Sequence, residues 1–234
     1  MATFEAQVQG LPGLTIDGSS TPTEDELTEF LKDGVLDVTA KYLDIAPQDS
    51  SLFMRKSSLT DSQGLDIGRA SIISVMREAN LDGSSDGTTS WRNCKRVSVS
   101  LQSRVVDPES LHFASKYNPV YILDDSGKIN VYPVPSANNG YQVYYINNEP
   151  KGDGTSDSLA RGHTTIGYFP KDKVYLVVIY AAIKSLEAKM SEFAIDEEDE
   201  ELVRGITSNI AALRSQYDAV LAKPQPQPAQ RGRR

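Results

Sequence analysis

Cysteine is nearly absent from this sequence. Cys94 is the only one among 234 residues, so no internal disulfide can form, which fits a reducing compartment. Basic residues are also too few to balance the acidic ones, and the net charge is −8. Because sequence-independent phosphate binding needs a basic surface, this balance disfavours a free-standing nucleic-acid binder.

Long hydrophobic runs are missing as well. The longest, residues 174–183 (VYLVVIYAAI), is far shorter than the roughly 20 residues of a membrane-spanning helix, and it fits a buried helix better. The first ten residues, MATFEAQVQG, lack the basic region and apolar run of a secretory signal. We therefore expect a soluble protein that is made inside the cell and has no membrane partner.

Residue types that build catalytic and metal sites are scarce too. The two histidines, His112 and His163, have no partner at metal-ligand spacing, and a single cysteine leaves no CxxC pair for zinc. His163 as a catalytic base would need a nucleophile and an orienting group. A solvated loop histidine is the favoured interpretation, and His112 is expected at a sheet margin. The sequence therefore predicts no enzyme, no cofactor and no bound metal.

Two acidic loops and one tryptophan have alternative interpretations. Residues 82–87 (DGSSDG) begin like an EF-hand loop, but the twelfth position is Asn93 rather than glutamate. Residues 153–157 (DGTSD) alternate in a similar way, and ordinary polar turns explain both loops better than calcium does. Trp91 is either an anchor for a carbohydrate or partner, or a core residue at the start of a strand, which is favoured.

Three segments have helical periodicity. Thr23 and Glu26 match a capping box, apolar residues then recur at helical spacing, and Pro47 ends the helix. A second helix is expected after Pro170, with residues 174–183 apolar nearly all round and hence central. The third carries a heptad seam. The seam residues are Val203, Ile206, Ile210, Leu213, Tyr217 and Val220. We expect the last two helices to form an antiparallel hairpin on which the first helix packs.

Between the first two helices, the periodicity changes to two. RASIISVMREA and CKRVSVSLQSR are rich in β-forming residues, and in the second of them Val97, Val99 and Leu101 alternate with polar residues. PVYILDDSGKINVYPVP predicts a hairpin with its turn at residues 124–127, and YQVYYI predicts the next strand after a turn at residues 138–140.

The predicted fold class is α+β. It consists of a three-helix bundle, made of one N-terminal helix and a C-terminal helix hairpin, with a large antiparallel β insertion and an extended C-terminal tail. The expected boundaries are an irregular N-terminal arm at residues 1–22, a helical bundle at 23–46 and 169–222, the inserted β domain at 47–168, and the tail at 223–234.

Charge is unevenly distributed along the chain. Six consecutive carboxylates precede the third helix and supply −6 of the net −8; they are Asp196, Glu197, Glu198, Asp199, Glu200 and Glu201. The tail has the opposite sign, with prolines at alternate positions followed by arginines; these residues are Pro224, Pro226, Pro228, Arg231, Arg233 and Arg234. Alternating proline favours an extended conformation with little entropy left to lose on docking, and arginines bond to carboxylates on a neighbour. The tail is thus a candidate partner-binding segment; the alternative is a solubilising tail.

Two stretches resemble structural proteins of tailed bacteriophages. LHFASKYNPVYILDDSGKINVYPVP has the order Ala-Ser, Pro-Val-Tyr, a turn, and then Val-Tyr-Pro-x-Pro. YFPKDKVYLVVIYAAIKSLEAKM is similar to the apolar helix that follows in those proteins. The chain resembles head–tail connector, or neck adaptor, proteins of the tail-tubular-A type, over about residues 23–220. The acidic run and the Pro-Gln tail are outside this resemblance.

The resemblance implies a virion protein of the neck, assembled in the host cytoplasm. It would form a homo-oligomeric ring, expected to be a dodecamer, between the portal protein above and a tail or nozzle protein below. DNA would pass through its channel without specific binding, and a channel wall bearing residues 196–201 would repel phosphate. In such proteins the C-terminal tail commonly inserts into the portal. The alternatives are a tail-completion or collar protein, or a glycan- or receptor-binding module built on the tyrosine-rich β region.

Overall fold

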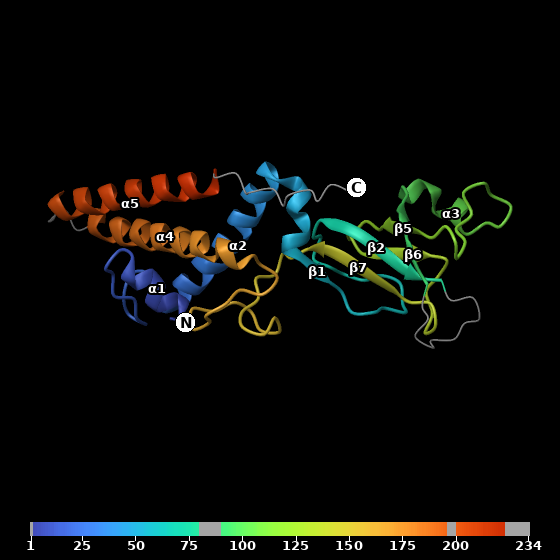
Figure 1. The fold of residues 1–234 in the computed structure, drawn as a ribbon, viewed down its shortest axis with the longest axis horizontal. Helices are drawn as coiled ribbons and strands as arrows, with labels where there is room; N and C mark the ends of the chain where they lie inside the picture. The colour runs from blue at the N-terminus through green and yellow to red at the C-terminus, as the bar shows by residue number, and fades with distance from the viewer. Residues whose placement is uncertain (1, 80–89, 196–199, 223–234) are drawn as a thin grey trace, which may run out of the picture. The chain divides into compact units, whose positions relative to one another are not determined.

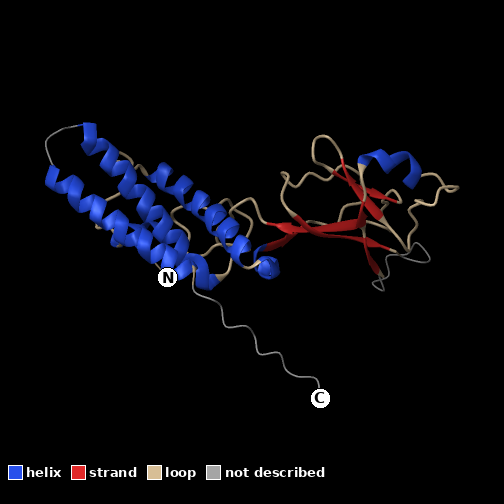
Figure 2. Cartoon of the chain, turned by 90° about the horizontal axis from the view of Figure 1, so that it is seen from above, coloured by secondary structure: helices blue, strands red, loops and turns tan. Residues whose placement is uncertain are grey.

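The computed structural model describes residues 2–79, 90–195 and 200–222. In this part of the chain, helices and mostly antiparallel sheets combine into an α+β fold, as the sequence predicts (Figure 1, Figure 2). The chain divides into two compact units. The helical unit comprises Met1–Pro47 and Glu149–Arg234, and the β unit comprises Gln48–Asn148. None of the described helices is both long enough and apolar enough to cross a membrane.

Helix α4 is the centre of the helical unit. The α-helices of this unit are α1 (Phe4–Gly10), α2 (Glu24–Ile45), α4 (Val174–Ile195) and α5 (Glu200–Leu221). Helix α4 contacts each of the other three, and Figure 1 shows it running alongside α5. The short 3-10 helix η3 (Lys171–Lys173) leads into α4 after Pro170. Leu176, Val177 and Ile179 of α4 are among its fully buried residues, which fits a helix that is apolar on every side.

Helix α2 begins and ends where the sequence predicts. The Thr23 hydroxyl accepts the Glu26 N–H at 3.3 Å, and the Glu26 carboxylate accepts the Thr23 N–H at 2.8 Å, so the capping box is complete. Gly34 faces α4, where a Cβ atom at that position would lie 3.0 Å from the Tyr180 ring and 3.2 Å from Val177. The absence of a side chain at Gly34 therefore allows the two helices to approach closely.

Helix α5 packs through the predicted heptad seam. Ile206, Ile210 and Tyr217 are buried, while Val203 and Leu213 are half-buried. The Tyr217 hydroxyl donates a 2.7 Å hydrogen bond to the Asp37 carboxylate of α2, so a polar bond joins α5 to α2 as well. The seam prediction is confirmed.

The expectation of an irregular arm at residues 1–22 is wrong for helix α1. Phe4 and Val8 have no exposed surface, and the Thr3 hydroxyl caps the helix by accepting the Ala6 N–H. Seven residues make a marginal helix in isolation. Here the first turn is fixed by tertiary contacts, because the Phe4 N–H donates to the His163 carbonyl at 3.0 Å and the Glu5 N–H to the Arg161 carbonyl at 3.1 Å.

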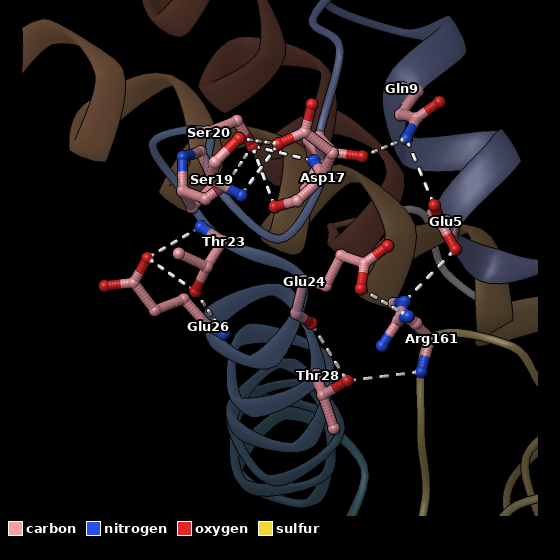
Figure 3. A network of polar contacts seen from close by, with 12 residues as sticks. Glu5, Gln9, Asp17, Ser19, Ser20, Thr23, Glu24, Glu26, Thr28 and Arg161 are labelled. Carbon is pink, nitrogen blue, oxygen red and sulfur yellow. Dashed lines mark hydrogen bonds and ion pairs between the residues drawn. The ribbon is translucent and has the colours of Figure 1, made fainter.

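Residues 149–168 belong to the helical unit, whereas the sequence prediction placed them in the β insertion. Arg161 shows why (Figure 3). Its guanidinium forms ion pairs with Glu5 of α1 and Glu24 of α2, and its backbone N–H donates to the Thr28 hydroxyl at 3.4 Å. This loop therefore joins α1 to α2 instead of extending the sheet.

The β unit contains two sheets. The strands are β1 (Met54–Lys56), β2 (Ile72–Glu78), β3 (Trp91–Asn93), β4 (Lys95–Arg96), β5 (Val120–Leu123), β6 (Ile129–Tyr132) and β7 (Tyr141–Ile146). The first sheet has the antiparallel order β1-β7-β2-β3, and the second has the order β4-β5-β6. A 3-10 helix, η1 (Pro47–Phe53), precedes β1. The β5–β6 hairpin and strand β7 are confirmed predictions.

One apolar core joins the two sheets. Tyr141, Val143 and Tyr145 alternate along β7 and face this core together with Ile129 and Val131 of β6. The Tyr141 hydroxyl donates to the Ile129 carbonyl at 3.2 Å and thus ties the sheets together. A second cluster lies on the opposite face of the β4-β5-β6 sheet. Its buried residues are Val105, Ala114, Val120, Ile122 and Tyr132. This sheet is therefore covered on both faces, which explains why β5 is a continuous apolar run.

Residues 97–101 are not the predicted strand, and the sheets are not wholly antiparallel. After β4 the chain turns into a 3-10 helix, η2 (Val99–Leu101), and a short helix, α3 (Gln102–Val105). The Ser98 hydroxyl accepts the Ser100 N–H, which offers the backbone an alternative to the strand. The connection through α3 then returns the chain beside β4, so that β4 and β5 pair in parallel.

Two buried charges hold the crossing from β6 to β7. The Arg77 guanidinium, 4% exposed, donates to the carbonyls of Pro133 at 3.1 Å, Glu78 at 2.8 Å and Val134 at 3.4 Å. The Glu78 carboxylate accepts the Gly140 N–H at 2.8 Å. Both buried side chains form hydrogen bonds with backbone groups of the chain around them, so their role is structural.

Candidate interaction surfaces

Most of the sequence-predicted site residues lie outside the described part of the chain. These residues are Pro224, Pro226, Pro228, Arg231, Arg233 and Arg234 of the tail, and Asp196, Glu197, Glu198 and Asp199 of the acidic run. Glu200 is the first residue of helix α5, and its side chain is not among those that the structure describes. Glu201 is exposed. The contribution of the tail and acidic run to binding therefore stays a prediction.

The histidines and the second acidic loop take part in structural contacts. The Nδ1 atom of His163 accepts the Ala160 N–H at 2.9 Å, and the ring packs so closely on Gly152 that a Cβ there would lie 2.1 Å from it. His163 is thus half-buried rather than the solvated histidine that was expected. His112, predicted at a sheet margin, is exposed in the loop after α3.

The Asp153 carboxylate accepts hydrogen bonds from residues later in the same connecting segment. It accepts the Thr165 hydroxyl and the Thr165 N–H, each at 2.7 Å, together with the Thr164 N–H. These hydrogen bonds, led by the one from the Thr165 hydroxyl, lower the pKa of Asp153. The first loop, residues 82–87, lies outside the description. Across residues 2–79, 90–195 and 200–222, no three His, Cys, Asp or Glu side chains are grouped as metal ligands.

The sole cysteine is unsuited to nucleophilic chemistry. Cys94 is buried in the core between the sheets. Burial raises the pKa of its thiol to about 12, so the thiolate is scarce at neutral pH.

An open groove lies in the helical unit. It has a volume of about 610 Å³ and is lined by the loop after α1 and by α4 and α5. Its large apolar lining residues are Leu14, Leu186, Phe193, Leu202 and Ile206, and the Lys189 ammonium lies 4.8 Å from the centre of the Phe193 ring. Such a lining suits an apolar segment of a protein rather than a reacting substrate.

A smaller cleft of about 430 Å³ lies in the β unit. Arg69 and Arg96 line it together with Asp124 and Asp125. Arg69 has a left-handed backbone, with φ of 57°, and its side chain lies against Gly127 in the β5–β6 turn. The two signs of charge in one cleft do not favour a particular ionic ligand.

Most of the exposed large hydrophobic side chains among the described residues of the β unit lie in residues 91–117, here called the lobe. It comprises β3, β4, η2, α3 and the loop that follows. Six large apolar side chains are each 36% exposed or more: Trp91, Val99, Val106, Leu111, Phe113 and Tyr117. A segment with this many exposed large apolar side chains is typical of a protein–protein interaction site. Trp91 is therefore not the buried strand-start residue that was favoured.

The lobe is attached to the rest of the β unit by buried residues. Val105 and Ala114 are buried against the outer face of the β4-β5-β6 sheet, and the Ala114 N–H donates to the Val105 carbonyl at 2.9 Å. Figure 1 shows α3 and the adjoining loop next to β5. Leu111 is fully exposed although the chain around it is hydrogen-bonded, with the Phe113 N–H donating to the Ser110 carbonyl. The lobe therefore presents apolar side chains on a folded support.

The lobe also differs from helix α2 in charge. Its basic residues are Arg92, Lys95, Arg96, Arg104 and Lys116, against only two acidic residues, Asp107 and Glu109. Helix α2 carries seven carboxylates and two lysines. Sequence reasoning missed the lobe because periodicity does not show which apolar residues stay exposed; the mixture of arginines with isolated apolar residues was the available signal.

The chain has no match among protein-family models and no significant match among curated proteins.

Proposed function

We propose that this chain is a structural virion protein of a tailed bacteriophage, a head–tail adaptor that connects the portal to the tail. The observation that carries the proposal is the resemblance of residues 111–135 and 168–190 to connector proteins. The first stretch corresponds to the end of the lobe, the β5–β6 hairpin and the residues after it. The second corresponds to the region from Tyr168 to the middle of α4.

The arrangement of elements supports the same proposal. Helix α2 precedes the β unit and helices α4 and α5 follow it, which is the order in the proteins that the chain resembles. We interpret α2, α4 and α5 as a three-helix bundle that carries the β unit as an insertion. The exposed apolar lobe adds a surface suited to protein partners, as an adaptor needs.

In this proposal the protein resides in the neck of the virion. It forms a homo-oligomeric ring, of dodecameric size, that binds the portal on one side and a tail or nozzle protein on the other. DNA passes through the ring without specific binding, and the acidic residues 196–201 face the channel. The extended tail, residues 223–234, is the tether to the portal.

The test is co-sedimentation with portal rings. The full chain should co-sediment, and truncation after Ala222 should weaken this binding while the melting temperature stays unchanged. Replacing Arg231, Arg233 and Arg234 with Ser should also weaken it, more at low salt than at high salt, because exposed ion pairs are screened. The control replaces the exposed Lys56, Lys128 and Lys171 with Ser. A full chain that does not co-sediment at either salt concentration refutes the adaptor proposal.

A glycan- or receptor-binding module is the second candidate, because Trp91 is 36% exposed. Aromatic rings with exposed faces are common in sites that bind sugars. Glycan-array binding by the full chain, lost on Trp91→Ala, would favour this candidate over the adaptor. A tail-completion or collar protein would form a ring but would not bind the portal.

A further inference from the structure

We infer that the lobe of one copy docks on the exposed acidic face of helix α2 of a second copy. This inference rests on the proposed function, since it specifies the contact between neighbours in the ring. The two surfaces lie on different units of the chain, and in a ring each copy presents its lobe to one neighbour and its α2 face to the other, which makes the contact heterologous. A heterologous contact repeats from copy to copy and closes into a ring when the rotation permits.

The acidic face is defined by residues at helical spacing. Its exposed members are Asp25, Glu29, Asp33, Leu36, Ala40 and Asp44, which recur every three or four residues and so lie on one side of α2. Within the described part of the chain, no ion pair uses Asp25, Asp33 or Asp44, whereas Glu29 pairs with Lys32 at 2.7 Å. Three carboxylates therefore lie in the first half of this face, followed by Leu36 and Ala40 and then by Asp44.

The lobe offers the complementary surface. Arg92, Lys95 and Arg104 are exposed, and no ion pair among the described residues engages them. Leu111 and Phe113 of the same lobe are also exposed and can pack on Leu36 and Ala40. Complementary charge orients an encounter and fixes its register, and a few desolvated apolar anchors supply most of the affinity.

The net charge of the lobe and its apolar side chains indicate that the lobe binds another copy of the chain rather than DNA. The lobe has five basic residues against two acidic ones, an excess of three. Phosphate-binding surfaces carry basic and polar side chains. The lobe also carries six exposed large apolar side chains, and contact with phosphate would not remove these from water. The exposed face of α2 has the opposite charge, and a second copy of the chain always supplies it.

The experiment uses two charge reversals in the full chain. The lobe-reversed variant carries Arg92→Glu, Lys95→Glu and Arg104→Glu, and the helix-reversed variant carries Asp25→Lys, Asp33→Lys and Asp44→Lys. Each variant alone places like charges across the contact, so self-association should weaken at least about tenfold in sedimentation velocity. The control variant, with Lys56, Lys128 and Lys171 changed to Glu, has the same charge change as the lobe-reversed one outside both surfaces.

Mixing the two reversed variants should restore assembly. The acidic lobe of one variant then meets the basic helix of the other, while its unchanged acidic helix meets the unchanged basic lobe. Only mixed assemblies are expected, with the two variants alternating. A contact formed within one chain, between its own lobe and helix, would give no mixed species and would overturn the inference.

A further pair of variants separates apolar from charged contributions. Leu111→Ser with Phe113→Ser should weaken self-association about tenfold or more at both low and high salt. The effect of the lobe reversal should shrink as salt rises. A wild-type chain that stays monomeric at the highest attainable concentration overturns the inference. Binding of a duplex DNA oligonucleotide that is lost in the lobe-reversed variant, without self-association, would assign the lobe to phosphate instead.

These outcomes are distinguishable from failure of the adaptor proposal. Rings that form on the portal with both reversed variants would refute this contact and leave the adaptor intact. Self-association that follows the reversal pattern, in a chain that does not bind the portal, would support the contact and refute only the adaptor.

Discussion

At the scale of single residues, the close packing of α2 on α4 depends on the absence of a side chain at Gly34. Gly34 of α2 lies against Tyr180 and Val177 of α4, and no larger residue fits without moving them. Gly205 of α5 has no atom within 4 Å of the place where a Cβ would lie. The same type of residue thus has opposite consequences on two helices of one unit.

The first prediction compares these two glycines. Gly34→Leu should lower the free energy of unfolding by about 2 kcal/mol, because overpacking at a helix contact forces backbone shifts. Gly205→Leu should raise it by about 0.5 kcal/mol, because Leu has the higher helix propensity and the position is open. Urea denaturation followed by circular dichroism measures both. Equal destabilisation by the two variants would contradict the close approach of α2 and α4 at Gly34.

The second prediction concerns alkaline pH. Burial, joined by the hydrogen bond to Asp37, raises the pKa of Tyr217, and burial raises the pKa of Tyr141 to about 12. In the unfolded chain a tyrosine titrates near 10. Both raised pKa values mean that the folded state favours the neutral phenol, so this stability is fully present below pH 10 and is lost progressively as pH rises towards 12.

Replacing these tyrosines tests the alkaline loss. Tyr141→Phe and Tyr217→Phe should each make the melting temperature fall less steeply between pH 9 and pH 11, although both variants start from a lower value because a hydrogen bond is lost. Tyr117→Phe, at an exposed position, is the matched control and should follow the wild type. A slope unchanged in all three variants would contradict burial of the two phenols.

At the scale of elements, the long periodic segments were predictable and the short ones were not. Helices α2 and α5 follow from a capping box and a heptad seam, both of which are local. Helix α1 has only seven residues and is fixed by hydrogen bonds to Arg161 and His163, more than 150 positions away, which no local pattern contains.

The β unit shows the same limit. The β5–β6 hairpin was predictable from its turn residues, but the alternation of Val97, Val99 and Leu101 was misleading. Ser98 ends the strand there, and the helix α3 that follows is fixed by the outer face of a sheet. The lobe could not be identified as a surface from the sequence. An apolar residue such as Leu111 is expected to be buried, and only the tertiary structure shows that it is exposed.

The third prediction tests the hairpin of α4 and α5. Ile210 is buried in the seam, whereas the neighbouring Ala211 is exposed on the same helix. Ile210→Asp should cost about 3 kcal/mol or more and unfold the helical unit, because it buries a charge without a partner. Ala211→Asp should change stability by less than about 0.5 kcal/mol. The measurement is thermal unfolding by circular dichroism. Similar melting temperatures for the two variants would show that α5 does not pack through this seam.

At the scale of the whole molecule, the β unit combines apolar cores of its own with a simple connection to the rest of the chain. The apolar clusters around Val143 and Ile122 consist of β-unit residues only. The β unit is also continuous in sequence, from Gln48 to Asn148. Its first and last strands are neighbours, since Met54 of β1 pairs with Ile146 of β7, so the chain enters and leaves the unit through adjacent strands. An insertion of this kind can be removed without stretching the chain that receives it.

The fourth prediction follows from this topology. Residues 48–148 expressed alone should fold cooperatively, with the same near-ultraviolet signal from Trp91 and the buried tyrosines as in the full chain. The complementary protein, in which a short Gly-Ser linker joins Pro47 to Glu149, should retain the helical signal of α2, α4 and α5. If the adaptor forms rings through the lobe and α2, neither protein should self-associate, but an equimolar mixture of the two should form a complex that the lobe reversal abolishes. A β unit that unfolds without cooperativity would show that its two cores depend on the helices, and the division of the chain into separate folding units would then be wrong.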